Sequence, residues 1–214
     1  MYKYILFDFD GTVFATEEGV TKSVRYAINK IGLDAPLSEL RCFVGPPLTE
    51  KFMEHFGFSP ETAEQAVADF RERYIPIGLY ECSLFPGIRE LVADLKAAGF
   101  VTGIATSKPQ PMAEKLLEGQ GMLPLFDVIS GSIGLADNTK AQVLKVAMDA
   151  LGADAEHSVL IGDTKYDVAG AKECGIDCIG VRYGYAAEGE LEAAAPEYIV
   201  DTVDDLRALL LGRE

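Results

Sequence analysis

The stretch Tyr4-Ile5-Leu6-Phe7-Asp8-Phe9-Asp10-Gly11-Thr12 decides the fold of this chain of 214 residues. Its first four residues are apolar and predict a short buried strand. At Asp8 the chemistry changes abruptly, so a loop is predicted to begin there. Gly11 allows a close approach of the backbone, and Thr12 adds a hydroxyl group. A strand that ends in this way is typical of the carboxyl edge of an open parallel sheet, where ligands bind.

Helical and extended patterns alternate along the chain after Phe85-Pro86-Gly87. Such alternation predicts a parallel sheet that is covered by helices on both faces. We therefore expect an α/β fold with a Rossmann-like, doubly wound core. The predicted strands cover residues 100–105, 126–129, 158–161, 178–181 and 198–200, and the predicted helices lie around 88–95, 112–118, 143–151, 168–173 and 206–210.

Between the first strand and this core, residues 16–80 have a helical period. One predicted face contains Val20, Val24, Ile28 and Ile31, and another contains Ala63, Ala66, Val67, Phe70 and Tyr74. Thr16 is predicted to cap the first helix, and Pro46 and Pro47 predict a non-helical corner. We expect a core made of residues 1–15 and 81–214, and an inserted all-helical cap made of residues 16–80.

Composition and charge exclude several classes of protein. Hydrophobic residues make up 49% and charged residues 25% of the chain, which is ordinary for a globular protein and excludes intrinsic disorder as the main state. The net charge of −15 disfavours nucleic acid polymers and anionic membrane surfaces as partners. No apolar stretch is long enough to span a membrane. The four cysteines form no Cys-x-x-Cys pair and are expected to be reduced thiols, so we expect a cytoplasmic protein.

Polar residues follow three of the predicted strands. Asp8 follows the first strand, Thr106 and Ser107 follow the strand at 100–105, and Asp163 follows the strand at 158–161. Taken singly, each could be a helix cap or a turn. Taken together, they are expected to converge at the carboxyl edge of the sheet. Thr106 and Ser107 are predicted to lie at a helix amino terminus, where backbone N–H groups bind anions.

Acidic residues accumulate at this expected meeting point. Asp8 and Asp10 are two residues apart, and Asp163 and Asp167 lie on one side of a turn that enters a helix. At about 4 Å and an effective dielectric constant near 20, each pair of like charges costs roughly 4 kcal/mol. The acids therefore need a multivalent cation, a raised pKa, or separation by solvent. The spacing of Asp163 and Asp167 suits one direct and one outer-sphere contact with Mg²⁺.

A lysine is also expected near this edge. Lys140 follows a predicted helix cap at Asp137 or Asn138, so its charge would lie at a helix start. Lys108 and Lys145 are competing candidates on periodicity alone.

These residues together resemble the haloacid dehalogenase-like phosphatases, in the branch of phosphoglycolate phosphatase and nucleotidase-like enzymes with a helical cap. The resemblance covers nearly the whole chain. It rests on Asp8-x-Asp10-Gly11-Thr12, Thr106-Ser107-Lys108, Lys140 and Gly162-Asp163-x-x-x-Asp167, in the order and spacing of the family.

The resemblance implies a role for each matched residue. Asp8 would be the nucleophile, Asp10 the general acid and base, and Lys140 the cation that neutralises nucleophile and phosphate. Mg²⁺ would be held by Asp8, by the backbone carbonyl of Asp10 and by Asp163, with Asp167 in support. The implied substrate-binding residues are Gly11, Thr106 and Ser107.

The expected function is a Mg²⁺-dependent phosphatase that hydrolyses small phosphomonoesters through an aspartyl-phosphate intermediate. The substrate would be a small phosphorylated metabolite, either phosphoglycolate-like or a nucleoside monophosphate. A phosphosugar mutase on the same scaffold and a catalytically silent binding module are the alternatives. Within the cap, the candidate substrate contacts are Arg41, Lys51, His55 and Arg71.

Overall fold

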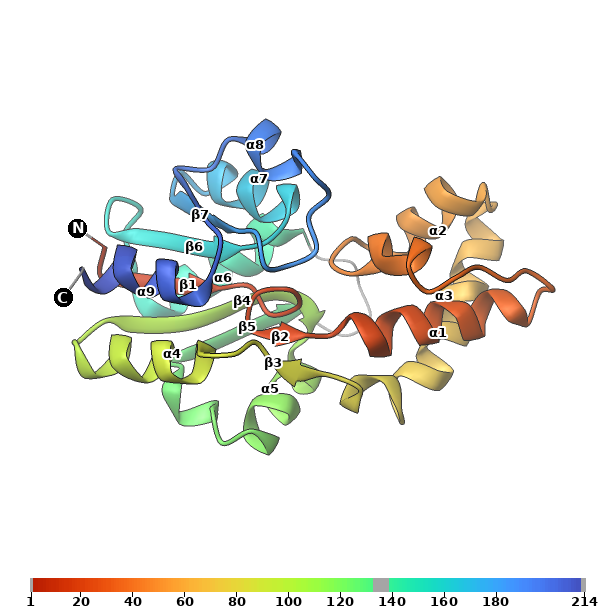
Figure 1. The fold of residues 1–214 in the computed structure, drawn as a ribbon, viewed down its shortest axis with the longest axis horizontal. Helices are drawn as coiled ribbons and strands as arrows, with labels where there is room; N and C mark the ends of the chain where they lie inside the picture. Colours follow the sequence, from red (N-terminus) through yellow and green to blue (C-terminus); the bar gives the residue numbers. More distant parts are fainter. Residues whose placement is uncertain (1, 133–138, 213–214) are drawn as a thin grey trace. The chain divides into compact units, whose positions relative to one another are not determined.

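The computed structural model describes residues 2–132 and 139–212. The chain divides into two compact units, one made of Met1–Phe14 and Leu84–Glu214 and the other of Ala15–Ser83 (Figure 1). The inserted unit thus begins at residue 15 where 16 was predicted, and ends at residue 83 where 80 was predicted. Where the chain passes between the units, the two short strands β2 (Phe14–Ala15) and β3 (Ser83–Leu84) pair with each other.

The larger unit is built on a six-stranded sheet with the strand order β5-β4-β1-β6-β7-β8. All five pairings between neighbouring strands are parallel. The strands are β1 (Tyr4–Phe7), β4 (Val101–Pro109), β5 (Val128–Ser132), β6 (Ser158–Gly162), β7 (Asp177–Val181) and β8 (Tyr198–Val200).

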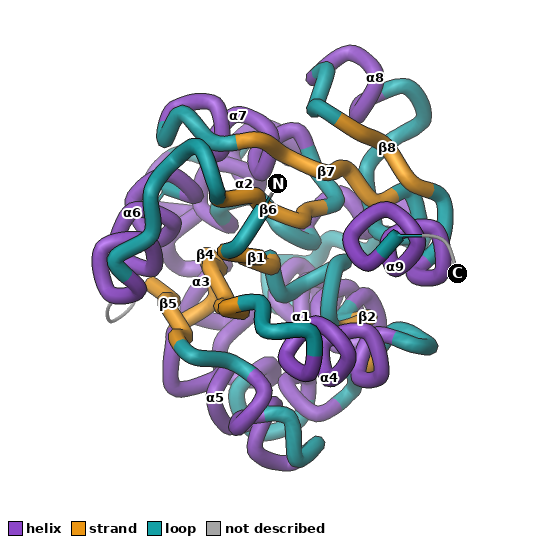
Figure 2. The backbone as a smooth tube through the Cα atoms, turned by 90° about the vertical axis from the view of Figure 1, so that its left-hand side faces the viewer, coloured by secondary structure: helices purple, strands orange, loops and turns teal. Residues whose placement is uncertain are grey.

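Helices cover both faces of this sheet, as Figure 2 shows. One layer contains α4 (Ile88–Ala97), α5 (Gln110–Gly119) and α9 (Val203–Leu211), and a 3-10 turn, η3 (Leu123–Leu125), follows α5. The other layer contains α6 (Lys140–Leu151), α7 (Lys165–Glu173) and α8 (Glu190–Ala194), with α7 packed against both α6 and α8. The predicted α/β class and doubly wound core are confirmed.

Strand β1 lies at the centre of the sheet, and all four of its residues are buried. Tyr4 pairs with Val101 of β4 on one side and with Ser158 of β6 on the other. The chain leaves β1 toward β4 and β5 and later returns to β6, so the topological switch point lies at the end of β1. The N–H of Asp8 donates to the Ile161 carbonyl at 2.8 Å, which carries the pairing one residue past the strand.

Strand β4 runs further than the sequence predicted. It continues to Pro109, and α5 begins only at Gln110. The pairing of β4 with β5 shifts its register over the last residues of the strand. The placement of Thr106 and Ser107 at a helix amino terminus was therefore wrong, because they lie in an irregular strand end. The prediction ended the strand at residue 105, where the apolar pattern stops.

The amino-terminal cap of α6 is Thr139. Its hydroxyl accepts the N–H of Gln142 at 3.3 Å, and the Gln142 side chain accepts the N–H of Thr139 at 3.0 Å. This reciprocal pair is a capping box, which fixes the first turn of the helix and makes Lys140 its first residue. The predicted caps, Asp137 and Asn138, lie outside the described residues.

The smaller unit consists mainly of helices. Its elements are α1 (Glu17–Asn29), η1 (Glu39–Phe43), α2 (Leu48–Phe56), α3 (Pro60–Tyr74) and η2 (Gly78–Tyr80), of which η1 and η2 are 3-10 turns. Helix α3 packs against both α1 and α2. As predicted, a proline corner at 46–47 separates η1 from α2, because proline cannot donate the hydrogen bonds of a continuing helix.

Two predictions for α1 were wrong in detail. Ile31 is 44% exposed, because the helix already ends at Asn29. Thr16 occupies the cap position, but its side chain makes no capping hydrogen bond. Its backbone angles, φ −106° and ψ 3°, do not match the extended conformation in which a cap side chain reaches the first turn.

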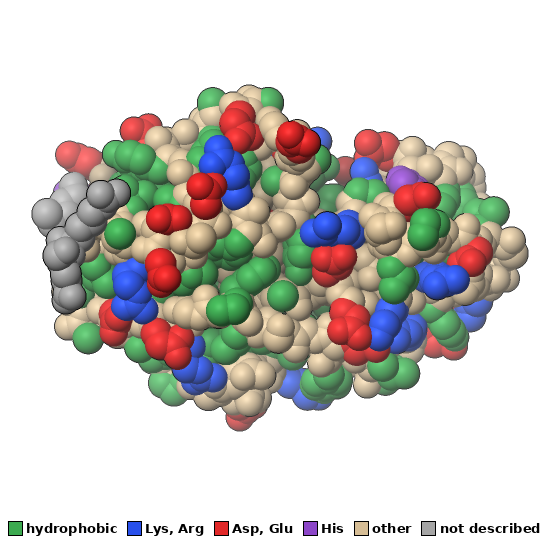
Figure 3. All heavy atoms as spheres, in the orientation of Figure 1, with side chains coloured by type: hydrophobic (Ala, Val, Ile, Leu, Met, Phe, Trp, Pro, Cys, Tyr) green, Lys and Arg blue, Asp and Glu red, His purple; other side chains and the backbone are tan. Residues whose placement is uncertain are grey.

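Basic and acidic side chains lie beside one another on the face that Figure 3 shows. Elsewhere in the described residues, ion pairs join such side chains: Arg182 pairs with Glu192 at 2.7 Å and with Asp201 at 2.6 Å. Cysteines 42, 82, 174 and 178 are all free. Among the described residues, no helix combines the length and the apolar character that crossing a bilayer requires.

Candidate active site

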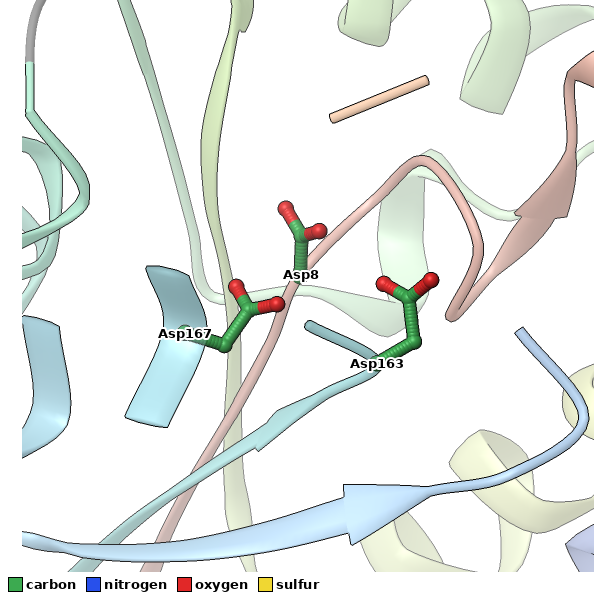
Figure 4. A group of neighbouring side chains, drawn as sticks. All are labelled: Asp8, Asp163 and Asp167. Atoms are coloured by element: carbon green, nitrogen blue, oxygen red, sulfur yellow. The ribbon is translucent and has the colours of Figure 1, made fainter. Parts of the chain in front are cut away.

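Three buried carboxylates meet at the carboxyl ends of β1 and β6. Asp8 follows β1, Asp163 follows β6, and Asp167 lies in the first turn of α7 (Figure 4). One oxygen from each lies within 4.8 Å of the others. Hard divalent cations prefer negatively charged oxygen ligands such as carboxylates. The donor atoms of this cluster therefore suit such an ion.

Lys140 reaches the same cluster from the first turn of α6. Its ammonium group forms ion pairs with Asp8 and, at 3.0 Å, with Asp167, and it donates to the Ala105 carbonyl at 3.1 Å. The lysine crosses α7 at Gly170, where an added Cβ would lie 2.6 Å from the Lys140 Cγ. Lys145 is exposed. Of the lysines considered from the sequence, Lys140 is the one that the structure places between Asp8 and Asp167.

Asp163 is held by the loop after β1 and the loop after β7. The Thr12 hydroxyl donates to its Oδ1 at 3.4 Å, and the Tyr185 N–H donates to its Oδ2 at 2.7 Å. Both loops approach through glycines. An added Cβ would lie 2.1 Å from the Asp163 carboxylate at Gly11, where φ is +87°, and 2.2 Å from the Asp163 Cβ at Gly184. The side chain is therefore fixed from two directions.

We expect Gly184→Ala to displace Asp163 and to lower kcat/KM by at least about tenfold, because small misplacements at a reacting centre are costly. The measurement is release of phosphate, the activity expected from the sequence, at graded concentrations of Mg²⁺, the expected cation; the variant should need more metal than the wild type. Gly119→Ala is the matched control, since its Cβ would meet nothing within 4 Å. Equal metal requirements for the wild type and Gly184→Ala would contradict the expectation.

The two carboxylate oxygens of Asp167 have different partners, the amino-terminal cap of α7 and Lys140. Its Oδ2 accepts the N–H of Thr164 at 3.0 Å and the Thr164 hydroxyl at 2.8 Å. Its Oδ1 faces Lys140. Gly162 lets β6 pass close by, because an added Cβ there would lie 2.3 Å from the Asp167 Cβ. Asp167 is thus anchored through its own helix start.

Burial and neighbouring charges shift the pKa values of Asp8, Asp163 and Lys140. Burial raises the pKa of the Asp8 carboxyl to about 7, against the lowering effect of the Lys140 ammonium. Burial and the charges of Asp167 and Asp8 raise the pKa of Asp163 well above its ordinary range. Burial disfavours the charged form of Lys140 and by itself would lower its pKa. The negative charges of Asp167 and Asp8 outweigh this effect, so the pKa of the lysine is raised. Asp8 and Asp163 thus lie in a place that disfavours their ionised form.

This shift predicts how the metal-free protein responds to pH. An acid whose pKa is raised from 3.8 to about 7 binds more protons in the folded than in the unfolded chain, so the free energy of unfolding falls as pH rises between these values. In chelator, we expect a lower melting temperature at about pH 7.5 than at about pH 5. Asp8→Asn should weaken this dependence, whereas exposed Asp204→Asn should not. If the melting temperature depended on pH in the same way in the wild type and in Asp8→Asn, the raised pKa of Asp8 would be refuted.

Asp10 does not belong to this group of three carboxylates and pairs with a second buried lysine. The Lys108 Nζ lies 3.0 Å from the Asp10 Oδ1. Thr106 is buried, and its hydroxyl accepts the Lys108 N–H at 3.1 Å, while Ser107 is half-buried. Gly11 continues the loop after Asp10. All of the residues that the sequence implicated in chemistry therefore lie in the larger unit.

The four candidate contacts of the cap belong to the smaller unit. Arg41 pairs with Glu17 at 3.1 Å, and Lys51 pairs with Glu54 at 2.9 Å. His55 packs edge-on against the rings of two phenylalanines, 43 and 56. Arg71 is half-buried on α3. The three carboxylates belong to the other unit.

Three supporting residues were missed from the sequence. Gly170 and Gly184 give no local signal, because the atoms that they accommodate come from distant segments. Thr164 could have been found, since Thr164 and Asp167 have the spacing of a capping box at the start of α7.

A model of the haloacid dehalogenase-like hydrolases matches residues 5–181 of the chain. The chain belongs to this family. Membership confirms the resemblance seen in the sequence, and membership together with phosphatase relatives confirms the expected enzyme class, a phosphoric monoester hydrolase. A crystal structure from Clostridium acetobutylicum, described as that of a predicted phosphatase, is 40% identical to this hydrolase, covers 100% of both chains and has a TM-score of 0.95.

Curated relatives of this hydrolase carry different names. A 5'-nucleotidase from Pseudomonas aeruginosa is 39% identical over 98% of this chain and 96% of its own length. The tyrosine-protein kinase PtkA from Mycobacterium tuberculosis is 36% identical over 96% of this chain and 72% of its own length. A phosphoglycolate phosphatase from Rhodospirillum rubrum is 32% identical over 88% of this chain and 83% of its own length.

Proposed function

We propose that this hydrolase releases inorganic phosphate from small phosphomonoesters through a phosphoaspartate on Asp8. The observation that carries the proposal is the position of Asp8 at the switch point, buried and ion-paired with Lys140 beside two further carboxylates. A carboxylate is a weak nucleophile toward a phosphate dianion, because the two repel each other. A buried lysine beside the nucleophile lowers that repulsion.

The residues of the larger unit divide the reaction between them. The Asp8 carboxylate attacks phosphorus, and the ester P–O bond breaks as Asp10 gives a proton to the departing oxygen. Asp10 then accepts a proton from the water that hydrolyses the phosphoaspartate. Thr106, Ser107 and the backbone at Gly11 are assigned to the phosphoryl oxygens. Lys140 keeps the nucleophile and the transferred group electrostatically paired throughout.

We assign the carboxylate cluster to Mg²⁺, held by Asp8, Asp163 and the backbone carbonyl of Asp10, with Asp167 in support. The bound ion supplies charge neutralisation on the phosphoryl oxygens. The donor set supports this assignment, because it consists of buried oxygens without a histidine or a cysteine.

Removal of divalent cations should abolish phosphate release, and Mg²⁺ should restore it. Ca²⁺ should inhibit, because it takes six to eight oxygen ligands at longer distances and can engage both Asp8 oxygens. The measurement is phosphate release in chelator and after addition of each metal. Undiminished activity in chelator, or equal support by Ca²⁺, would contradict the metal assignment.

The names of the relatives support two classes of substrate, nucleoside monophosphates and phosphoglycolate-like esters. We assign the choice between them to the inserted helical unit, residues 15–83. Phosphate release from a panel of both classes, together with 4-nitrophenyl phosphate, tests this assignment. Pro46→Ala should change the ranking of the natural esters more than it changes hydrolysis of the artificial one. An equal effect of Pro46→Ala on all esters would show that this unit does not select the substrate.

The cytoplasmic location and the lack of nucleic acid and membrane partners stay predictions.

A second candidate, phosphoryl transfer to tyrosine, is favoured by the 36% identity with a protein named as a tyrosine kinase. Incubation with a nucleoside triphosphate and a tyrosine-containing peptide separates the two candidates. Phosphotyrosine without phosphate release from monoesters would favour the kinase. A burst of enzyme phosphorylation by a phosphosugar without net phosphate release would instead indicate a mutase.

A further inference from the structure

The described part of the larger unit buries a second lysine at the carboxyl edge, which the proposed mechanism does not use. The side chain of Lys108 is 5% exposed, and that of its partner Asp10 is 15% exposed. The ammonium group lies 3.0 Å from the Asp10 Oδ1 and 5.8 Å from the centre of the Phe9 ring. A lysine is seldom buried unless its charge is paired, so this placement calls for a role.

Contacts at the end of β4 hold the backbone of Lys108 in place. The Thr106 hydroxyl accepts the Lys108 N–H at 3.1 Å, where the strand departs from regular pairing. On the neighbouring strand, an added Cβ at Gly131 would lie 2.6 Å from the Lys108 carbonyl and from the Gln110 backbone. The lysine therefore projects from a backbone that is held on both sides.

The Asp10 carboxyl has one oxygen, Oδ1, directed at Lys108. Its Oδ1 is buried and has no directed hydrogen bond among the described residues. Asp8, Asp163 and Asp167 form the carboxylate cluster, whereas the Asp10 carboxyl turns to Lys108. Each lysine thus pairs with a different acid: Lys140 with the proposed nucleophile Asp8, and Lys108 with the proposed proton donor Asp10.

We propose that Lys108 is a positioning residue that holds the Asp10 carboxyl on the leaving-group side of the site. The inference rests on the proposed function. In the assisted step, the Asp8–phosphorus bond forms, the ester P–O bond breaks, and the proton moves from Asp10 to the departing oxygen. An alkoxide needs this proton, whereas nitrophenolate is stable without it. Lys108 therefore matters for alkyl esters and little for nitrophenyl esters.

The test compares an alkyl phosphate, glycerol phosphate, with 4-nitrophenyl phosphate for the wild type and four variants: Lys108→Met, Lys108→Arg, Asp10→Asn and the double variant Lys108→Met/Asp10→Asn. General acid catalysis is worth about 10²- to 10⁴-fold. Lys108→Met should lower kcat for the alkyl ester by roughly 10- to 100-fold with little change in KM, as a partial loss of that factor. Its effect on the nitrophenyl ester should stay within about threefold.

The double variant should be no slower than Asp10→Asn, because both changes remove the same proton transfer. Lys108→Arg should recover part of the alkyl-ester rate. Lys145→Met, at an exposed position of α6, is the matched control and should leave both rates unchanged.

Equal losses on both esters, a raised KM for both, or additive losses in the double variant would overturn the inference in favour of phosphate binding or a structural role. If Lys108→Met does not fold, Lys108→Gln gives the same comparison. Hydrolysis of 4-nitrophenyl phosphate that is lost in Asp8→Asn shows that the proposed function holds even where the Lys108 inference fails. A wild-type protein that hydrolyses neither of these esters, nor nucleoside monophosphates nor phosphoglycolate, would refute both.

Discussion

Replacing Asp8 with asparagine should abolish phosphate release and leave the fold intact. The amide cannot form the phosphoenzyme, and removal of a covalent nucleophile costs on the order of 10⁴-fold or more in kcat. The fold should persist because the substitution is isosteric and removes a buried acid whose pKa is already raised. Lys140 keeps its ion pair with Asp167.

The measurement combines phosphate release, the melting temperature in chelator, and mass spectrometry of the protein after incubation with substrate. The wild type should gain the mass of a phosphoryl group, and Asp8→Asn should not. Asp204→Asn is the control for loss of an acid at an exposed position. More than trace turnover by purified Asp8→Asn would remove Asp8 from the role of nucleophile.

Replacing Lys140 with methionine should reduce both activity and stability. Methionine keeps the apolar stem but leaves Asp8 and Asp167 without their shared cation. Removing one partner of a buried ion pair typically destabilises a protein by about 3–5 kcal/mol. Loss of one preorganised charge at a reacting phosphate should also lower kcat by roughly 10²- to 10³-fold.

Urea denaturation in chelator measures the change in the free energy of unfolding, and phosphate release measures the rate. Added Mg²⁺ should recover part of the lost stability, because a bound cation compensates the same carboxylates. Lys145→Met should show neither effect. A Lys140→Met protein with wild-type stability and turnover would show that the ion pairs with Asp8 and Asp167 contribute little.

The larger features of the fold could be predicted from the sequence because they depend on periodicity. In a parallel sheet the carboxyl ends of strands share one edge, so the convergence of Asp8 and Asp163 follows once the alternation of strands and helices is known. The two acids lie one residue past β1 and one residue past β6. Their meeting could therefore be inferred without any knowledge of side-chain geometry.

The finer features could not be predicted, because they depend on contacts between distant segments. Periodicity does not distinguish Lys140 from Lys108, and in the structure both lysines are buried beside an acid. The difference arises from Gly170 of α7, which lets Lys140 pass, and from the irregular end of β4, which carries Lys108. The irregular end of β4 also explains why Thr106 and Ser107 were placed incorrectly.

The position of β1 between β4 and β6 has a consequence for the newly synthesised chain. Strand β1 is made first, but its partner Ser158 and the anchor of Asp167 follow more than one hundred residues later. The helical unit of residues 15–83 is made in between and packs within itself. A ribosome-bound chain can thus complete this unit while Asp8 is still exposed to water. If the proposed roles of Asp163 and Asp167 hold, phosphate release requires α7 to have left the ribosome and packed against β6 and β7, so nascent fragments that end before α7 should be inactive.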